Sequence, residues 1–487
     1  MPHDDAVWTK PTAAVRHVRV KETVRILVVG GGYVGMYTAL RLQKRLKHEI
    51  RSGEAEIVVV EPRPYMTYQP FLPEAAAGAV SPRHVVVPLR RVLPGCRLLV
   101  GEVRRIDHAR RTATVSTPAT EETGGEDLSL PYDLLVLAPG SVPRTLPVPG
   151  LAEHGIGFKT VEEAIGLRNH VLEQLDIASS TRDPAVREAA LTFVFVGGGY
   201  AGVEALAELE DMARYACRYH PAITPDDMHW ILVEATDRVL PEVGGEMGRY
   251  VLSELRGRNV DVRLETRLVS CEDRLVVLSD GSRLPARTLV WTAGVKAHPV
   301  LESTDLPRDA RGRLRCTAAL RVQGTDDAWA AGDAAAVPDL TAAGPAAPGR
   351  HGPGPGTGPA GECAPNAQHA RRQARTLADN IVAHLRGTPQ KEYRHRYAGS
   401  VASLGVHKGV AHVYGRKVKG RPAWLIHRGY HLSRMPTFNR KVRVLAEWTL
   451  AGLFKREIVP LGSLEHPRAE FEAQVRRGEG PGGGAGT

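Results

Sequence analysis

Two glycine-rich turns in the chain have the residue types and spacing needed to hold phosphate groups. GGGYVG occupies residues 30–35 and GGGYAG occupies residues 197–202. In a G-x-G-x-x-G turn the first glycine allows a tight turn, the second lets a pyrophosphate approach the backbone, and the third lets a helix pack on a strand. These roles fall to Gly30, Gly32 and Gly35 in the first copy and to Gly197, Gly199 and Gly202 in the second.

Each turn lies inside a segment that reads as strand, turn, helix and strand. The first copy follows the apolar run Val24–Val29 and precedes a helix expected from about Tyr33 to Leu46. The next strand ends in Glu61, and KHEIRSGE before it is expected to form a loop. A carboxylate at that strand end can accept hydrogen bonds from a ribose 2′-hydroxyl.

The second copy repeats this order and carries Glu234 at the end of the strand WILVEA. A carboxylate there repels the 2′-phosphate of NADP and favours NAD, although Arg238 follows closely. Two such units indicate an α/β fold with two nested Rossmann-like dinucleotide-binding domains. The length of 487 residues and the ordinary apolar and charged fractions agree with a multidomain globular protein.

With two such units the sequence resembles the two-dinucleotide-binding-domain flavoproteins. The resemblance implies that the first turn binds FAD and the second binds NADH. YDLLVLAPGS (132–141) and TLVWTAGV (288–295) resemble the crossing strands that link the two domains. AWAAGDAA (328–335) resembles the second flavin-binding motif, so Gly332 and Asp333 are expected at the ribityl or pyrophosphate part of FAD.

Cysteine spacing limits where electrons can go from the flavin. The five cysteines lie far apart and form no CxxC or similar close pair, which argues against a dithiol relay or a zinc site. No metal is expected. The remaining electron acceptors are external, either a protein such as ferredoxin or a lipid-soluble quinone.

A predicted helix that begins near Pro365 or Asn366 resembles the AQxAxQ quinone-site motif of the type II NADH dehydrogenases. Ala367, Gln368 and Ala370 match, whereas Arg372 stands at the second glutamine. The resemblance implies that Gln368 contacts quinone.

Two further segments match the same family. Glu204, early in the second glycine-turn helix, is implied to face the nicotinamide and quinone region, or it interacts favourably with the helix dipole. Residues 63–80 are implied to lie along the flavin, with Thr67, Tyr68 and Gln69 nearest. We expect no single essential acid or base, because proximity of the two rings supplies most of the rate.

The positive charge of the chain is concentrated near its C-terminal end. Residues 391–446 contain 13 Lys or Arg and one acidic residue, which gives +12 against +10 for the whole chain. A helix after Asn439 is expected to be amphipathic and either lies in a membrane interface or packs on its own domain. No nucleic-acid-binding pattern accompanies the charge. Its apolar face is expected to contain Val442, Leu445, Trp448, Thr449, Leu453 and Phe454.

The resemblance implies that this basic segment docks the protein to a membrane where quinone is dissolved. The sequence shows neither the apolar core of a signal peptide nor an uncharged apolar run of about 18 residues. We therefore expect a peripheral protein on the cytoplasmic side of the cell membrane. The sequence is compatible with a homodimer but does not determine the oligomeric state.

The predicted function is that of an FAD-dependent NADH:quinone oxidoreductase in the respiratory chain, which passes hydride from NADH to flavin and two electrons to quinone without pumping protons. A soluble NADH:ferredoxin-type reductase and a flavin- and NAD-binding redox sensor without turnover stay open as alternatives. The expected parts are a tail (1–23), a split FAD-binding domain (24–150 and 296–390) with a Gly/Pro-rich insertion (341–362), an NADH-binding domain (151–295), a membrane-docking region (391–465) and a second tail (466–487).

Overall fold

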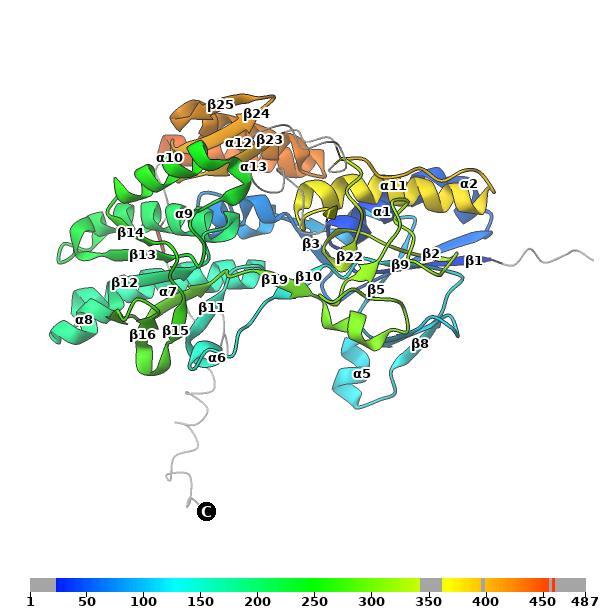
Figure 1. The fold of residues 1–487 in the computed structure, drawn as a ribbon, viewed down its shortest axis with the longest axis horizontal. Coiled ribbons are helices and arrows are strands. Elements are labelled where there is room, and N and C mark those ends of the chain that lie inside the picture. Colours follow the sequence, from blue (N-terminus) through cyan, green and yellow to red (C-terminus); the bar gives the residue numbers. More distant parts are fainter. Residues whose placement is uncertain (1–22, 342–360, 396–398, 455–457, 460–487) are drawn as a thin grey trace, which may run out of the picture.

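The computed structural model describes residues 23–341, 361–395, 399–454 and 458–459. They form two lobes side by side, with a C-terminal region above the place where the lobes meet (Figure 1). The expected N-terminal tail, Gly/Pro-rich insertion and C-terminal tail fall almost entirely outside the described residues.

The first lobe is built on a five-stranded parallel sheet in the order β21-β9-β1-β2-β5. Its strands are nearly all apolar because parallel sheets are normally covered on both faces. Helices α1 (Tyr33–Arg45) and α11 (Ala367–Leu385) pack together on one face, as Figure 1 shows. The strands are β1 (Val24–Val29), β2 (Ala55–Glu61), β5 (Arg97–Val100), β9 (Leu134–Leu137) and β21 (Ala328–Ala330).

The second lobe repeats this arrangement with a parallel sheet in the order β11-β18-β12-β13-β14. Helix α9 (Tyr200–Ala216) follows its glycine turn as α1 follows the first. The two predicted strand-turn-helix-strand units are therefore confirmed. The strands are β11 (Gly155–Gly157), β12 (Thr192–Val196), β13 (His229–Val233), β14 (Val260–Arg263) and β18 (Thr288–Trp291).

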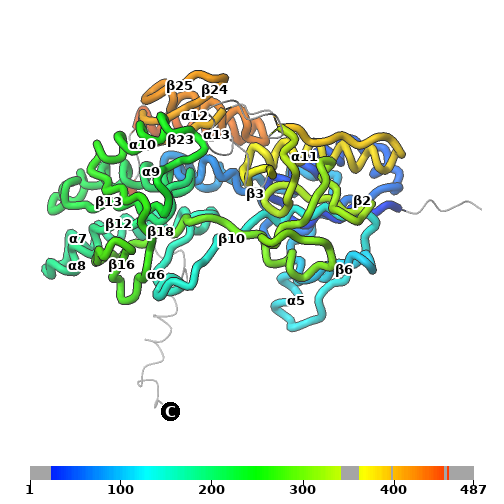
Figure 2. Tube along the Cα trace, viewed as in Figure 1, coloured from blue at the N-terminus to red at the C-terminus, as the bar shows by residue number. Residues whose placement is uncertain are grey.

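Two details of the sequence prediction are wrong. KHEIRSGE is not a simple loop, because its first five residues form the short helix α2 (Lys47–Arg51). Most of the segments 132–141 and 288–295 does not cross between the lobes, since β9 and β18 lie inside the two sheets. The crossing begins only at the last residue of each segment, where β10 (Ser141–Pro143) pairs antiparallel with β19 (Val295–Ala297), and Figure 2 shows this narrow connection.

The C-terminal region is a small antiparallel sheet with two helices. Strands β23 (Gly399–Ser403), β24 (Gly409–Val413) and β25 (Arg416–Lys419) precede α12 (Gly420–Arg434) and α13 (Phe438–Phe454). This sheet and α12 lie over α9 of the second lobe (Figure 1). Among the described residues, no helix combines the length and apolar character needed to cross a bilayer.

Helix α13 is amphipathic as predicted, but Trp448 lies on its inner face. The indole packs edge-on against Phe71, with ring centroids 5.4 Å apart, and its Nε1 donates a hydrogen bond to Glu74 Oε2 at 2.7 Å. The inner face also holds buried Val444, and Glu447 accepts a hydrogen bond from the backbone N–H of Ser81. Trp448 therefore lies on the packed side of the helix, and the predicted grouping of it with the exposed Leu453 and Phe454 on one face is wrong.

Candidate functional site: two glycine turns and the surface between them

The first glycine turn has a tight side and an open side. Gly30 has φ +96°, and a Cβ there would lie 2.3 Å from Ala138 O. A Cβ at Gly35 would lie 1.7 Å from Gly30 O, so the helix start can approach the strand only without a side chain. At Gly32 no atom lies within 4 Å of an added Cβ. This open position at the N-terminus of α1, where backbone N–H groups are free to donate, leaves room for an anion such as a pyrophosphate.

The second turn has the same geometry. Gly197 has φ +117° and packs on Thr292, and a Cβ at Gly202 would lie 2.0 Å from Gly197 O. Gly199 is open, with no atom within 4 Å of an added Cβ. The N-terminus of α9 therefore offers a second cradle for a dinucleotide.

The two acidic residues at the strand ends fold back onto their glycine turns. Glu61 Oε2 accepts a hydrogen bond from Gly31 N at 2.5 Å, and Glu234 Oε2 accepts one from Gly198 N at 2.6 Å. Burial raises the pKa of Glu61, and the bond from Gly31 opposes that rise. Both carboxylates thus occupy the position from which a ribose hydroxyl can be bound.

Two neighbours of Glu234 define that site further. Thr236 donates hydrogen bonds to Glu234 Oε1 from its backbone N–H and its hydroxyl, both at 2.8 Å. Sequence reasoning did not identify Thr236. Arg238 makes two hydrogen bonds of 2.8 Å to Asp237, so its guanidinium is already engaged by a carboxylate.

Asp333 lies where the end of β21 meets the crossing segment. Its Oδ2 accepts a hydrogen bond from Ser141 Oγ at 2.6 Å, and Lys159 Nζ lies 2.8 Å from the same hydroxyl. Burial lowers the pKa of Lys159, while Asp333 acts in the opposite direction. No sequence motif marks Lys159, which precedes α7 (Val161–Ser180). Next to Asp333, Gly332 N donates to Gln373 Oε1 at 2.7 Å.

The predicted quinone-motif residues lie at the start of α11. Asn366 caps this helix by accepting a hydrogen bond from His369 N at 2.9 Å. Gln368 Nε2 donates to Gly399 O of β23 at 2.9 Å, and its Oε1 is buried without a partner in the described part of the chain. Arg372 occupies the position of the second glutamine of the motif, and its Nη1 lies 3.3 Å from His395 Nδ1.

Residues 67–69 lie between the first lobe and α12. Thr67 ends the strand β3 (Tyr65–Thr67), and Gln69 begins a short 3-10 helix. The buried Tyr68 donates its hydroxyl hydrogen bond to His431 O at 2.9 Å. Tyr68 therefore fastens α12 to this segment.

Glu204 is buried on α9 beneath the C-terminal region. Its Oε1 accepts a hydrogen bond from Ser403 N at 2.8 Å and lies 3.2 Å from His427 Nε2, without hydrogen-bond geometry between them. Burial raises the pKa of Glu204 to about 8 and lowers that of His427 to about 3. Near neutral pH this contact therefore joins two uncharged groups. Ser403 and His427 were not identified from the sequence.

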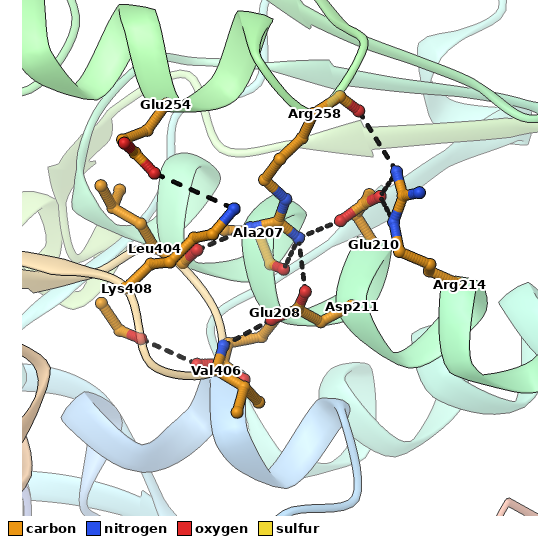
Figure 3. A network of polar contacts seen from close by, with 11 residues as sticks. Ala207, Glu208, Glu210, Asp211, Arg214, Glu254, Arg258, Leu404, Val406 and Lys408 are labelled. Atoms are coloured by element: carbon orange, nitrogen blue, oxygen red, sulfur yellow. Dashed lines mark hydrogen bonds and ion pairs between the residues drawn. The ribbon is translucent and has the colours of Figure 1, made fainter. Parts of the chain in front are cut away.

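A network of charges fixes the rest of α9 to the same region, as Figure 3 shows. Arg258 pairs with Glu210 and, at 2.9 Å, with Asp211, and it donates to Leu404 O at 2.6 Å. Asp211 also accepts a hydrogen bond from Val406 N. The loop between β23 and β24 is thereby held over α9, which keeps Ser403 against Glu204.

The five cysteines are free and offer no dithiol chemistry. Burial raises the pKa of Cys96, Cys316 and Cys363 to about 12 in each case, so these thiols stay protonated. In the described ranges, no group of three or more His, Cys, Asp or Glu could hold a metal ion.

Known proteins share both the sequence pattern and the fold. The pyridine nucleotide-disulphide oxidoreductase family matches residues 20–374. Type II NADH:quinone oxidoreductase of Staphylococcus aureus is 28% identical over 407 residues, which cover 82% of this chain and 92% of that protein. The enzyme of the same name from Staphylococcus epidermidis is 28% identical over 408 residues, with the same coverage of both chains. The structure of NDH2 from Plasmodium falciparum in complex with NADH superposes with a TM-score of 0.79 at 17% identity, covering 90% of this chain and 100% of that chain.

Proposed function

Because the chain belongs to the pyridine nucleotide-disulphide oxidoreductase family, we propose that it is an FAD-dependent NADH:quinone oxidoreductase of type II. The observation that carries this proposal is the duplicated site: two open glycine turns, each closed by a strand-end carboxylate, on two five-stranded parallel sheets. We assign residues 24–150 and 296–390 to the FAD-binding domain and residues 151–295 to the NADH-binding domain.

The first lobe fits FAD through residues of three segments. Gly30, Gly32 and Gly35 leave room for the pyrophosphate, and Glu61 is placed for the adenosine ribose. Asp333, held by Ser141, would bind the ribityl or pyrophosphate region beside Gly332. Thr67 and Gln69 would line the flavin. When bound, FAD supplies the redox chemistry by taking a hydride from NADH and releasing two electrons.

The second lobe would bind NADH through Gly197, Gly199, Gly202 and Glu234. The Glu234 carboxylate accepts hydrogen bonds and carries negative charge, so it suits a ribose 2′-hydroxyl and repels a 2′-phosphate. Arg238, paired with Asp237, does not offset this preference. NADH is therefore expected to be used in preference to NADPH.

The electron acceptor must come from outside the chain, because no thiol pair is present to take electrons. Gln368 has a buried carbonyl oxygen without a described partner, and Glu204 is a buried carboxyl that is mostly protonated at neutral pH. We assign quinone contact to Gln368 and a supporting role at the nicotinamide and quinone side to Glu204. Glu204→Ala should slow NADH:quinone turnover while bound flavin stays in place, and loss of flavin would contradict that assignment.

The outer face of α13 supports docking to a membrane surface. Leu453 and Phe454 are 72% and 76% exposed, and Val442, Leu445 and Leu450 are exposed as well. Basic residues near such a face meet anionic headgroups at the bilayer interface. We place the protein as a peripheral component at the cytoplasmic face of the cell membrane. A homodimer stays a prediction that sedimentation analysis would check.

Liposome flotation tests the docking surface. The double substitution Leu445→Glu with Leu453→Glu should reduce the fraction that floats with anionic vesicles at least tenfold, because two charges would enter the apolar interface. The control Val269→Glu changes an apolar residue of the second lobe that is 50% exposed, close to the 53% of Leu445, and should float like the unchanged protein. Unchanged flotation of the double variant would favour an acidic protein carrier as the partner of the basic region.

Steady-state turnover tests the reaction itself. The purified, FAD-loaded protein should oxidise NADH continuously when a short-chain quinone is supplied, with a higher kcat/KM for NADH than for NADPH. A single turnover followed by arrest would indicate a redox sensor. Turnover with ferredoxin but not with quinone would indicate the soluble reductase.

A further inference from the structure

A lysine of the second lobe reaches the boundary between the lobes and joins a chain of hydrogen bonds there. Lys159 lies between β11 and α7, which both belong to the second lobe. Its Nζ donates to the carbonyl oxygen of Ser141 and, at 2.8 Å, to the Ser141 hydroxyl. Ser141 begins the crossing strand β10, and its hydroxyl donates in turn to Asp333 Oδ2 at 2.6 Å. The chain therefore runs from the second lobe to the residue that follows β21 of the first lobe.

The chemistry of the three side chains fixes the direction of this chain. A lysine ammonium has three N–H donors and no acceptor, whereas a serine hydroxyl has a single hydrogen to donate. Ser141 Oγ must therefore accept from Lys159 and give its one hydrogen to Asp333. Hydrogen bonds in such a row polarise and strengthen one another. Asp333 Oδ2 is thereby engaged, and Oδ1 has no hydrogen bond in the described part of the chain.

The backbone of Lys159 is fastened to the start of α7. Glu163 Oε2 accepts hydrogen bonds from Lys159 N at 2.6 Å and from Thr160 N at 2.8 Å. Thr160 Oγ1 accepts one from Glu163 N at 3.1 Å, which completes a capping box. Helix α7 also packs on α3 (Leu72–Ala76) and α9. The second lobe thus sets the position of Lys159, while its ammonium group acts on a residue of the crossing strand.

The charge of Lys159 is held at this boundary although burial opposes it. Burial lowers the pKa of Lys159, and the nearby carboxylates of Asp333 and Glu163 oppose that fall. Neither carboxylate forms a direct ion pair with the ammonium group in the described ranges. The other crossing strand contributes His298, whose pKa is lowered by burial and by Lys159 and raised by Glu102. A partly buried cation therefore lies where both crossing strands meet Asp333, and it reaches that carboxylate through Ser141.

We propose that Lys159 is a positioning residue for FAD, which the second lobe supplies to the cofactor site of the first lobe. By directing the Ser141 hydroxyl to Asp333 Oδ2, it leaves Oδ1 to accept a hydrogen bond from the cofactor. Its positive charge also favours an anionic cofactor nearby. This inference rests on the proposed function, because it takes Asp333 to bind FAD. The affinity for FAD should therefore depend on a residue outside the FAD-binding domain.

Fluorescence titration of the full-length, FAD-free protein with FAD tests this role without NADH or quinone. Lys159→Met and Ser141→Ala should each raise the Kd for FAD about tenfold, the loss expected for one hydrogen bond to a charged group. The double variant should lose no more than about twofold beyond the weaker single variant, because both changes break the same chain of hydrogen bonds. Lys159→Arg keeps a positive group that only donates, so it should bind FAD about threefold more tightly than Lys159→Met.

The matched control is Lys296→Met. Lys296 is exposed on β19 and pairs with Val142 of β10, so the change removes the same charge from the same crossing and should alter the Kd less than about twofold. The FAD-free variants should unfold within about 3 °C of the unchanged protein.

Equal FAD affinity in Lys159→Met and the unchanged protein would overturn this role and leave the proposed function standing. An equal loss in Lys296→Met, additive losses in the double variant, no recovery in Lys159→Arg, or a larger fall in the unfolding temperature of FAD-free Lys159→Met would also overturn it. An unchanged protein that binds no FAD would overturn the proposed function together with this role.

Discussion

The buried carboxyl of Glu204 makes the stability of the fold depend on pH in a predictable direction. The residue is only 7% exposed, and burial raises its pKa to about 8, with the hydrogen bond from Ser403 N opposing the rise. In the unfolded chain a glutamate titrates near 4.3. At a pH between these two pKa values, Glu204 therefore keeps its proton in the folded state but has lost it in the unfolded chain. Stability from this group is fully present below about pH 4 and is lost as pH rises through 8.

The size of the effect follows from the difference in pKa. Each unit corresponds to about 1.36 kcal/mol, so the free energy of unfolding should fall by about 2.7 kcal/mol between pH 5 and pH 7 on account of this residue. Glu204→Gln removes the titration and keeps an oxygen that can accept the Ser403 hydrogen bond. Between pH 5 and pH 7, the free energy of unfolding of the variant should therefore rise by about 2.7 kcal/mol relative to that of the unchanged protein.

Urea unfolding at pH 5, 6, 7 and 8 measures this difference directly, with far-UV circular dichroism as the signal. Glu122→Gln, at an exposed position, is the control and should show no pH-dependent difference of this size. If the difference between Glu204→Gln and the unchanged protein stays constant across the pH range, Glu204 is ionised throughout. The description of it as a mostly protonated, buried carboxyl would then be wrong.

Three further substitutions test other parts of the structure. Gly199→Ala fills open space at the second glycine turn, so it should raise the KM for NADH about tenfold while changing the free energy of unfolding by less than about 1 kcal/mol. Gly202→Ala would place a Cβ 2.0 Å from Gly197 O. It should therefore destabilise the fold severely, which thermal unfolding would show. Trp448→Ala removes the packing against Phe71 and the bond to Glu74, and should cost about 3 kcal/mol in urea unfolding. Equal NADH affinity in Gly199→Ala, or a cost below about 1 kcal/mol for Trp448→Ala, would contradict these assignments.

The sequence alone was sufficient to predict those features that depend on residues close together in the chain. Each glycine turn, its preceding strand and its following helix lie within about fifty residues, and the positions of Glu61 and Glu234 follow from where their strands end. The capping of α11 by Asn366 was likewise predictable, because a side-chain acceptor before an apolar helical stripe marks a helix start.

Contacts between distant segments could not be obtained in this way. Glu204 meets Ser403 across 199 positions, and Lys159 reaches Ser141 only because the crossing strands bring the lobes together. The grouping of Trp448 with the exposed apolar residues of α13 was wrong for a related reason. Apolar residues lie on both sides of α13, and periodicity alone does not tell which side faces Phe71.

Anaerobic absorbance titration of the purified protein tests the central claim, that one bound flavin lies between an NADH site and a quinone site. The visible flavin bands should bleach with one equivalent of NADH and return with one equivalent of a short-chain quinone. A protein that is colourless and takes up no FAD would contradict the account. A bleached protein that stays bleached when quinone is added would contradict it equally.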